Sequence, residues 1–551
     1  MKKKYLFLFL FTACLITQLS AQTFQWAKRE GLYAYDYGFG VSTDQSGNVY
    51  VAGKYEMNAN FSGIILPNQG NHDIYVAQYS PSGALNWIRT AGGLYGDYAH
   101  ALACDGSNYV YIAGEIEGFG TPITFVGSSV TLKSTGSNDA FLAKYDLNGN
   151  ILWAKSAGGF FNDKALGVTY DAFGNVFICG YFNDTAYFGG NTTIYGYGQN
   201  DIFVAKYDAN GNFKWVRSSG GNGRDEANGV KCDEAGNVYV CGLYSNGALF
   251  GNKTLTCMGG GCNTFLSKYS TDGDLKWVKT GGSIYNDIAW GLTADKKGKI
   301  YMCGESRDRA TFDGITLINS DSADVLVACY DTSGTINWAV RAGGIHDDRV
   351  RGITCDDNNL YITGQYGGQV AFDGFTLNAA DNSDIFIACL NKKGNYQWIK
   401  SVGGPPDSSE TVGFEAGTAI CADRSGNVYT TGALLNGGVF GNTVLYPYSR
   451  TDMFLTRISL VTEVNEIAAT DTKPLPYPNP GIGHFSVNLD QTMNNEIELR
   501  IYNCQGQTID VSKRINSSRI EFDMSGYSKG IYFFELKTKN DLISRGKFVY
   551  Q

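Results

Sequence analysis

The chain has 551 residues, of which 43% are hydrophobic and 18% charged, so it can bury a large core and is not disordered as a whole. Its 70 glycines, 36 tyrosines and 31 phenylalanines, with only 10 prolines, favour strands joined by many tight turns. A formal net charge of −9 argues against a general nucleic-acid-binding protein, because such a protein needs a basic face.

Residues 1–21 are expected to be a signal peptide. Three lysines follow the first methionine, and residues 5–19 form an apolar run that is too short to cross a bilayer comfortably. Small residues then precede the expected cleavage site between Ala21 and Gln22. Cys14 leaves a lipoprotein signal open as an alternative. No later apolar run is long enough for a membrane-spanning helix, so no transmembrane segment is expected in the mature chain.

Tryptophan spacing reveals an internal repeat. Seven of the eight tryptophans recur at intervals of 60 to 66 residues, and only Trp290 lies outside the series. Such regular spacing is typical of repeat architectures. The repeat tryptophans are Trp26, Trp87, Trp153, Trp215, Trp277, Trp338 and Trp398.

Each repeat is predicted to contain two hairpins, and therefore four main strands. One hairpin has a glycine four residues before the tryptophan, as in Gly211 before Trp215, and the other turns at Asp-x-x-Gly, as at Gly236. Between them lies a variable stretch, such as residues 312–317, that predicts a further minor hairpin. This addition explains why a repeat has roughly 61 residues when a bare four-stranded blade needs about 40.

Seven such units predict an all-β protein with a seven-bladed β-propeller, because radial closure leaves few exposed sheet edges. The two ends of the array complement each other. The last unit, ending near residue 459, lacks its Trp-bearing strand, while residues 23–29 carry Trp26 without preceding strands. We expect residues 23–29 to complete the seventh blade as its outer strand. An open solenoid with a frayed end remains the alternative.

The repeat resembles the SBBP β-propeller repeat family. The resemblance rests on a series of residues in each unit and covers residues 23–459, so the propeller domain is placed at residues 22–460. It implies a propeller fold and an extracytoplasmic setting but no single activity. In one unit the matching residues are Asp201, Gly211, Trp215, Gly220, Gly221, Asp225, Asp233 and Gly236.

The C-terminal part has a different character. Residues 461–474 contain no repeat signature and are expected to be a linker, and residues 475–551 alternate as expected for a small Ig-like β-sandwich. This region resembles the type A sorting domain of the type IX secretion system. The resemblance implies the secretion machinery as a partner and a secreted or outer-surface location in a Gram-negative bacterium. The residues that carry it are Pro478, Asn479, Pro480, Gly530, Tyr532 and Lys547.

Cysteines offer one candidate disulfide. Most of the 12 cysteines that follow the signal peptide occupy equivalent repeat positions, too far apart to be bridged readily, and are expected to be small buried hydrophobes. Cys257 and Cys262 differ because they flank Met-Gly-Gly-Gly in one variable loop, where a local disulfide is expected.

An aspartate ten residues after each repeat tryptophan forms a candidate ring around one mouth of the central channel. Its carboxylates could bind a cation such as calcium, or each could cap loop N–H groups; repetition favours capping. Ser408 stands at the seventh position, beside an insertion. The ring consists of Asp36, Asp97, Asp163, Asp225, Asp287 and Asp348. Capping is also expected for the residue that opens each third strand, namely Asp73, Asp139, Asp201, Asn263, Asp324, Asp384 and Asp452.

The repeat tryptophans are expected to pack between sheets, and recognition is expected in the loops that differ between units. These loops span residues 54–73, 115–139 and 405–415, and they are rich in Tyr, Asn, Ser and Gly.

No catalytic constellation is found in the sequence. The four histidines are not spaced as metal ligands or as a triad, and the single Gly-x-Ser-x-Gly match at residues 526–530 lies between strands. The sequence therefore predicts a secreted or surface binding and adhesion protein for a glycan or a protein, without an enzymatic activity and without a cofactor other than calcium. The alternatives are a propeller enzyme, either a quinoprotein-like oxidoreductase or a glycoside hydrolase, and a structural surface scaffold.

Overall fold

The computed structural model divides the chain into two compact units, residues 1–461 and 462–551, which are described separately. Apart from a single 3-10 turn, Gly189–Asn191, the regular elements of the described residues are all strands, as the composition predicts. The residues described are 22–318, 322–380, 382–404, 415–448, 450–460, 476–477, 481–493, 497–503, 508–514, 517–538 and 542–550. The expected signal peptide, residues 1–21, and the expected linker, residues 461–474, lie outside them.

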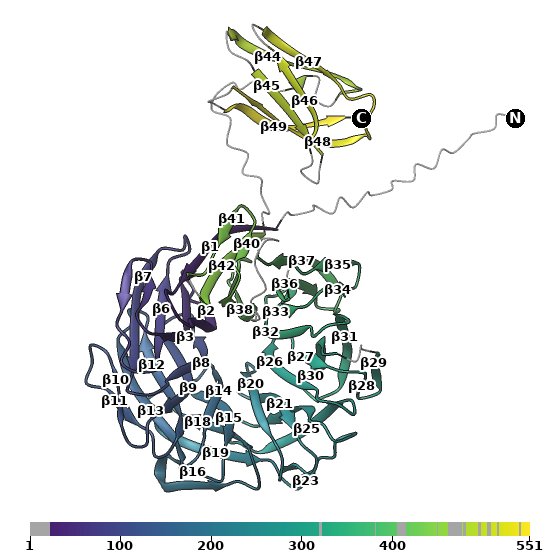
Figure 1. Cartoon of the computed structure of the whole chain (residues 1–551). Helices are drawn as coiled ribbons and strands as arrows, with labels where there is room; N and C mark the ends of the chain where they lie inside the picture. The colour runs from purple at the N-terminus through teal and green to yellow at the C-terminus, as the bar shows by residue number, and fades with distance from the viewer. Residues whose placement is uncertain are drawn as a thin grey trace, which may run out of the picture. The chain divides into compact units, whose positions relative to one another are not determined.

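Seven sheets among the described residues of the first unit share one pattern of four antiparallel strands (Figure 1). The first three strands follow one another in the chain, and the fourth carries the repeat tryptophan. From first to fourth strand, the sheets are β2 (Tyr37–Thr43), β3 (Val49–Glu56), β6 (His72–Tyr79) and β7 (Leu85–Gly92); β8 (Tyr98–Cys104), β9 (Tyr109–Glu117), β12 (Asn138–Asp146) and β13 (Ile151–Gly159); β14 (Lys164–Tyr170), β15 (Val176–Phe182), β18 (Asp201–Tyr207) and β19 (Phe213–Ser219); β20 (Glu226–Cys232), β21 (Val238–Tyr244), β24 (Asn263–Tyr269) and β25 (Leu275–Gly282); β26 (Ile288–Ala294), β27 (Lys299–Ser306), β30 (Asp324–Asp331) and β31 (Ile336–Gly344); β32 (Arg349–Cys355), β33 (Asn359–Tyr366), β36 (Asp384–Asn391) and β37 (Tyr396–Val402); and β38 (Ala416–Ala422), β39 (Val428–Leu434), β42 (Asp452–Leu460) and β1 (Gln22–Glu30).

The variable stretch of each repeat forms the expected minor hairpin. Four of these hairpins also pair with the fourth strand of the preceding sheet, through β10, β16, β28 and β34, and so widen that sheet. The hairpins are β4 (Ala59–Phe61) with β5 (Ile64–Leu66), β10 (Pro122–Phe125) with β11 (Thr131–Lys133), β16 (Thr185–Phe188) with β17 (Thr192–Tyr195), β22 (Leu249–Phe250) with β23 (Lys253–Thr254), β28 (Arg309–Phe312) with β29 (Ile315–Ile318), β34 (Gln369–Phe372) with β35 (Phe375–Asn378), and β40 (Gly438–Phe440) with β41 (Thr443–Leu445).

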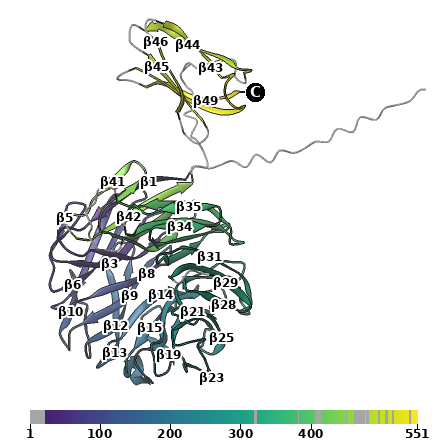
Figure 2. The ribbon, with the colours of Figure 1, turned by 45° about the vertical axis from the view of Figure 1, so that its right-hand side comes forward.

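The first strands of neighbouring sheets contact each other around a common centre (Figures 1 and 2). The series returns to its start, since β38 contacts both β32 and β2. In the last sheet β1 pairs antiparallel with β42, with Trp26 opposite Arg457. This pairing confirms that the N-terminal strand supplies the Trp-bearing strand that the last repeat lacks.

The repeat tryptophans bind each sheet to the next. The indole Nε1 of each of six tryptophans donates a hydrogen bond of 3.0–3.3 Å to a turn carbonyl of the following sheet. The ring of Trp153 also covers Gly211, where a Cβ would lie 2.8 Å from its Cδ2 atom. The glycine four residues before each of the other six repeat tryptophans, all except Trp26, is therefore required by the tryptophan of the preceding sheet. Trp398 is 7% exposed and packs in a hydrophobic cluster with Tyr361.

The second unit contains two antiparallel sheets with one hydrophobic core, in which Phe485, Phe522 and Phe548 contact one another. Gly530 opens β48, Tyr532 is buried in the core, and Lys547 is exposed on β49. Pro478, Asn479 and Pro480 lie outside the described residues. The strands are β43 (Pro476–Tyr477), β44 (His484–Met493) and β47 (Ser517–Asp523) in one sheet, and β46 (Thr508–Arg514), β45 (Ile497–Tyr502), β48 (Gly530–Lys537) and β49 (Leu542–Tyr550) in the other.

Candidate functional site

Each of the seven first strands contains a β-bulge at the same place. The extra residue follows the second residue of the strand, so two residues oppose one on the partner strand. A bulge redirects a side chain, and bulges often lie next to functional sites. Here all seven bulged residues line one cavity of about 570 Å³ at the centre of the first unit. They are Phe39, His100, Leu166, Asn228, Trp290, Arg351 and Thr418.

A second cavity, of about 440 Å³, lies where the first strands begin. It shares Tyr35, Tyr37, Phe39 and His100 with the first cavity, so the two are contiguous. We refer to both together as the central channel. Both volumes fall in the range of small-molecule sites, about 300–1,000 Å³. The other residues lining the second cavity are Lys54, Tyr98, Glu115, Glu117, Asn138 and Lys164.

Aromatic rings form one wall of the central channel. Tyr37 and Phe39 stack with their ring centres 5.6 Å apart and their planes 9° apart. Tyr98 and His100 stack in the same way, at 5.6 Å and 12°, and Phe39 lies 5.6 Å from His100. Tyr35 and Trp290 add two further rings to the channel lining. Planar, rigid side chains of this kind provide apolar contact area for a ligand at low entropic cost.

Glu115 is the centre of a polar cluster in the channel. Its Oε1 atom lies 2.9 Å from Lys164 Nζ and 3.0 Å from His100 Nε2, and its Oε2 accepts a hydrogen bond of 2.5 Å from Asn138 Nδ2. Burial alone would raise the pKa of Glu115, but His100 and Lys164 outweigh it and lower that pKa to about 2. Glu115 is therefore a fully ionised, fixed carboxylate.

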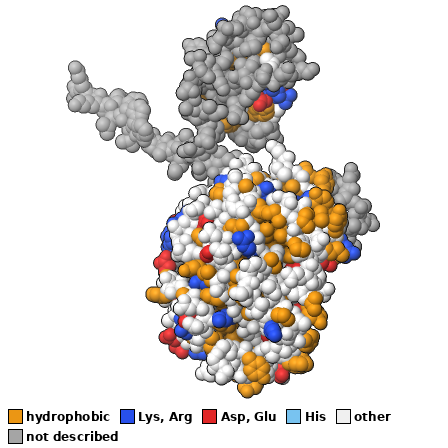
Figure 3. All heavy atoms as spheres, turned by 90° about the vertical axis from the view of Figure 1, so that its left-hand side faces the viewer, with side chains coloured by type: hydrophobic (Ala, Val, Ile, Leu, Met, Phe, Trp, Pro, Cys, Tyr) orange, Lys and Arg blue, Asp and Glu red, His pale blue; other side chains and the backbone are white. Residues whose placement is uncertain are grey.

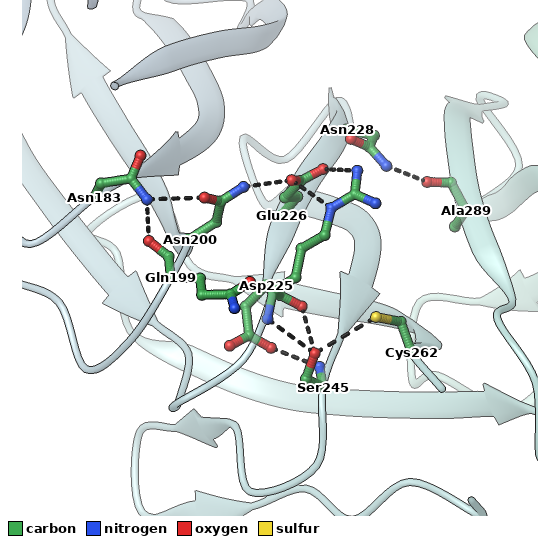
Figure 4. Close-up of polar contacts among 10 residues, drawn as sticks. Asn183, Gln199, Asn200, Asp225, Glu226, Asn228, Ser245, Cys262 and Ala289 are labelled. Atoms are coloured by element: carbon green, nitrogen blue, oxygen red, sulfur yellow. Dashed lines mark hydrogen bonds and ion pairs between the residues drawn. The ribbon is translucent and has the colours of Figure 1, made fainter. Parts of the chain in front are cut away.

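A similar cluster lies on β20 (Figure 4). Glu226 Oε1 accepts hydrogen bonds from Arg224 Nε at 2.7 Å and from Asn200 Nδ2 at 2.6 Å. The adjacent Asn228 donates through Nδ2 to the carbonyl of Ala289 at 2.9 Å, whereas its buried Oδ1 has no partner among the described residues. Glu226 is thus neutralised by its neighbours, and Asn228 retains an unused acceptor in the channel.

The six ring aspartates cap loop N–H groups, as their repetition favours, and none of them lines either cavity. Each is at most 1% exposed and is enclosed at the junction between sheets. Each Oδ2 accepts the backbone N–H of the residue four positions earlier at 2.6–3.2 Å. Each Oδ1 accepts a backbone N–H from a residue 19 or 20 positions later at 2.7–3.2 Å. This is the geometry of loop capping. Among the described residues, no group of three or more His, Cys, Asp or Glu is placed to hold a metal ion.

At several junctions the capping aspartate faces a second buried acid, the one that opens a third strand. A Cβ on Gly158 would lie 2.8 Å from both Asp139 Oδ1 and Asp163 Oδ2. Burial, with a smaller contribution from the nearby Asp139, raises the pKa of Asp163 to about 8. At the fifth junction an asparagine replaces the acid, and Asn263 Nδ2 lies 3.5 Å from Asp287 Oδ2. At this junction an amide N–H therefore faces the aspartate in place of a second carboxyl group.

The seventh capping position is occupied by Glu415 rather than by Ser408. Glu415 immediately precedes β38, is 1% exposed, and accepts the backbone N–H of Asn436 through Oε1 at 2.7 Å. The assignment to Ser408 counted ten residues from Trp398, but the insertion displaces the capping position along the chain. Ser408 itself lies outside the described residues.

The expected disulfide between Cys257 and Cys262 is absent, because both residues are free thiols. Their sulfur atoms have different neighbours: Cys257 Sγ lies 3.5 Å from the carbonyl oxygen of Tyr244, and Cys262 Sγ lies 3.5 Å from Ser245 Oγ. Proximity in sequence was therefore a poor guide to pairing within this loop.

The variable loops contribute only part of the central channel. Lys54, Glu115, Glu117 and Asn138 come from two of the loops proposed for recognition, while most of the remaining loop residues form the minor hairpins. The third loop lies almost wholly outside the described residues. Sequence reasoning missed the bulged residues, although six of them stand thirteen residues after a repeat tryptophan. Trp290, the tryptophan outside the repeat series, is one of these.

Exposed hydrophobic side chains surround the same end of the first unit. They stand seven or eight residues after a repeat tryptophan, in the loops that lead to the first strands, and are 38–79% exposed. We call them the apolar crown: Tyr33, Leu94, Tyr95, Phe160, Phe161, Ile284, Tyr285 and Ile345. Figure 3 shows hydrophobic side chains gathered at several places on one side of the molecule, most of all along its upper right-hand edge. Contiguous exposed apolar surface often marks an interaction site.

Two family models match the chain. Residues 16–54 match the β-propeller repeat model SBBP, and residues 476–551 match the secretion system C-terminal sorting domain. The chain thus carries an SBBP repeat match in its N-terminal part and a sorting-domain match at residues 476–551. The sorting domain indicates recognition by the type IX secretion machinery, and thus export to the medium or to the cell surface. No helix among the described residues is long and apolar enough to span a membrane.

Curated relatives share only part of the chain. It is 32% identical over 277 residues to the regulatory protein FlaEY of Caulobacter vibrioides, a match that covers 46% of this chain and 29% of that protein. It is 28% identical over 141 residues to an uncharacterized WD repeat-containing protein of Acanthamoeba polyphaga mimivirus, covering 24% of this chain and 10% of that protein. The chain thus spans less than a third of either relative.

Among solved structures, the chain is similar to the extracellular domain of a putative hybrid two-component system from B. thetaiotaomicron. The match covers 93% of this chain and 81% of that one, at 12% identity and a TM-score of 0.21. That score is too low to support a functional comparison.

Proposed function

We propose that the mature chain is an SBBP-repeat binding protein, exported to the cell surface or the medium, that holds a glycan in its central channel. In this proposal the seven four-stranded sheets are the blades of a closed seven-bladed β-propeller, and β1 closes the ring. The second unit is proposed to be an Ig-like sorting domain whose role ends with export.

The seven bulged residues carry this proposal. They occupy one repeated geometric position, yet all seven side chains differ in type, whereas repeated tryptophans, glycines and aspartates maintain the ring. Seven different side chains at seven equivalent backbone positions can together form one asymmetric binding site. The aromatic rings suit the apolar C–H faces of sugar rings, and Asn138, Asn228 and Glu115 suit their hydroxyl groups.

We propose a binding role rather than glycoside hydrolysis. A glycoside hydrolase with two catalytic carboxyl groups needs a raised pKa at one of them, which acts as the general acid. Glu115 has the opposite character, because Lys164 and His100 keep it ionised. Glu226 is likewise paired with Arg224.

Trp290→Ala tests the proposal directly. The mature protein should bind members of an array of bacterial, algal and plant polysaccharides, and the variant should lose about tenfold or more in affinity. Phe173→Ala is the matched control, because Phe173 is 73% exposed on the turn between β14 and β15 and does not line either cavity. If the wild type binds no saccharide, or if the two variants behave alike, the proposal fails and a structural scaffold becomes the better hypothesis.

A further inference from the structure

The central channel contains a buried lysine without a partner. Lys54 is only 9% exposed, and its ammonium group lies 5.1 Å from the ring centre of Tyr37 and 5.0 Å from that of Tyr98. Within the described part of the chain, its Nζ atom makes no hydrogen bond and no ion pair. Burial lowers the pKa of Lys54, which reflects the loss of water around the charge.

A second cation of the channel, Arg351, is half-buried. The guanidinium carbon of Arg351 lies 4.0 Å above the ring of Trp290, and this group forms no hydrogen bond or ion pair with the residues that the structure describes. Trp290 Nε1 is itself buried without an acceptor. The cavity that Arg351 lines includes neither Asp nor Glu.

Glu56, two residues after Lys54 on β3, has a buried Oε2 atom without a hydrogen-bond partner among the described residues, but it lines neither cavity. The other acids near the two cations have partners. Glu115 is paired with Lys164 and His100, and Glu226 with Arg224. Glu117, which lines the smaller cavity, accepts the backbone N–H of Gly96 at 3.0 Å. The larger cavity therefore holds a cation and no acid, although the whole chain carries a net charge of −9.

A buried charge without a partner is unfavourable, and a cation–π contact offsets only part of the lost hydration. Two such cations in one aromatic channel are well placed for an anionic group of the ligand. We infer that the ligand is an acidic saccharide, an inference that rests on the proposed function. Its uronate carboxylates would contact Lys54 and Arg351, and its sugar rings would lie against the aromatic wall. Planar rings with amide groups between them favour a sugar over an acidic peptide, which offers fewer flat faces.

The experiment compares ligands that differ only in the carboxylate. Isothermal titration calorimetry of the mature protein would use an oligogalacturonate and the same oligosaccharide after reduction of its carboxyl groups. Poly-glutamate provides the acidic-peptide arm. We expect the uronate ligand to bind about tenfold or more tightly than its reduced form, because a charge-assisted hydrogen bond contributes more than a neutral one.

The variants identify the cations responsible. Lys54→Met and Arg351→Gln should each weaken uronate binding by about tenfold or more, and should weaken binding of the reduced oligosaccharide by a clearly smaller factor. Lys206→Met is the matched control: Lys206 is also 9% exposed and lies 5.3 Å from the ring of Phe177, but it donates to Thr271 outside the channel. Lys206→Met should bind uronate like the wild type.

The outcomes separate this inference from the proposed function. Equal binding of both oligosaccharides, unchanged in the Lys54 and Arg351 variants, would overturn the acidic ligand and leave a glycan-binding channel. Binding of poly-glutamate alone would also overturn it. Absence of binding to every saccharide would overturn both proposals.

Discussion

The glycine of each Trp-bearing hairpin is required for two separable reasons, and the two can be measured separately. Gly211 has φ +78°, and a Cβ there would lie 2.8 Å from Trp153 Cδ2. Gly247 has a similar φ of +89° but no atom within 4 Å of the position of its Cβ. Gly211→Ala introduces both backbone strain and overpacking, while Gly247→Ala introduces strain alone.

We therefore expect Gly247→Ala to lower the free energy of unfolding by about 1 kcal/mol and Gly211→Ala by about 2–4 kcal/mol. Urea titration of both variants, followed by tryptophan fluorescence, measures the difference. Equal losses would mean that the contact with Trp153 does not restrict this position.

The fifth junction between sheets provides a natural neutral version of the acid pairs. Asn263 donates through Nδ2 to the carbonyl of Ser283 at 2.9 Å and faces Asp287, while Asp73 faces Asp97 and has a buried Oδ1 without a partner. At pH 8 we expect Asp73→Asn to raise the free energy of unfolding by about 1 kcal/mol and Asn263→Asp to lower it by about 1–3 kcal/mol.

Chemical denaturation at pH 8 and at pH 5 tests these opposite substitutions. Both changes in the free energy of unfolding should be smaller at pH 5, because one aspartate of a buried pair can keep its proton there. The idea of a shared proton is wrong if Asn263→Asp is tolerated equally at both pH values.

At the scale of whole elements, β1 is the strand on which ring closure depends. It pairs along its length with β42, and Trp26 donates to the carbonyl of Pro81 in the neighbouring sheet at 3.0 Å. Deletion of residues 22–29 should lower the melting temperature sharply, because β42 loses its partner and the Trp26 packing worth about 3–5 kcal/mol is removed.

The same deletion allows a rescue experiment. A synthetic peptide of residues 22–30 should restore the melting temperature in a concentration-dependent way, whereas a scrambled peptide should not. An unchanged melting temperature after the deletion would exclude closure by this strand.

Much of the fold could be predicted because it depends on residues that recur at regular intervals in the sequence. These features are the order of strands, the N-terminal strand of the last sheet and the minor hairpins. A tryptophan that covers a glycine of the next sheet, for example, keeps a constant distance along the chain from that glycine. The bulged residues leave no such pattern, because six of them stand at a constant distance from a repeat tryptophan but all differ in residue type from one unit to the next. The channel was missed for this reason, and Trp290 was set aside as an exception to the repeat. The capping position at Glu415 was misassigned because the insertion changes the count.

Over the whole molecule, the buried acids predict an unusual dependence of stability on pH. Burial raises the pKa of Asp97 and of Asp163 to about 8, and that of Asp36 and of Asp348 to about 7, far above the value of about 3.9 in an unfolded chain. Between these values the folded chain binds more protons than the unfolded chain. The stabilisation is therefore fully present below about pH 4 and is lost as the pH rises through 7 to 8.

The melting temperature should accordingly fall between pH 5 and pH 8.5, with the free energy changing by about 1.4 kcal/mol for each proton and pH unit involved. Calorimetry of the wild type and of the double variant Asp73→Asn and Asp139→Asn tests this expectation, because removing one acid of two pairs should flatten the profile. General repulsion in an acidic protein also grows with pH, so the double variant Asp272→Asn and Asp357→Asn, which makes the same change of charge at exposed positions, serves as the control. The melting temperature should fall more steeply with pH in the wild type and in this control than in the Asp73→Asn and Asp139→Asn variant. That result would place the pH dependence at the junctions between sheets. If all three profiles coincide, the pH dependence arises from net charge alone.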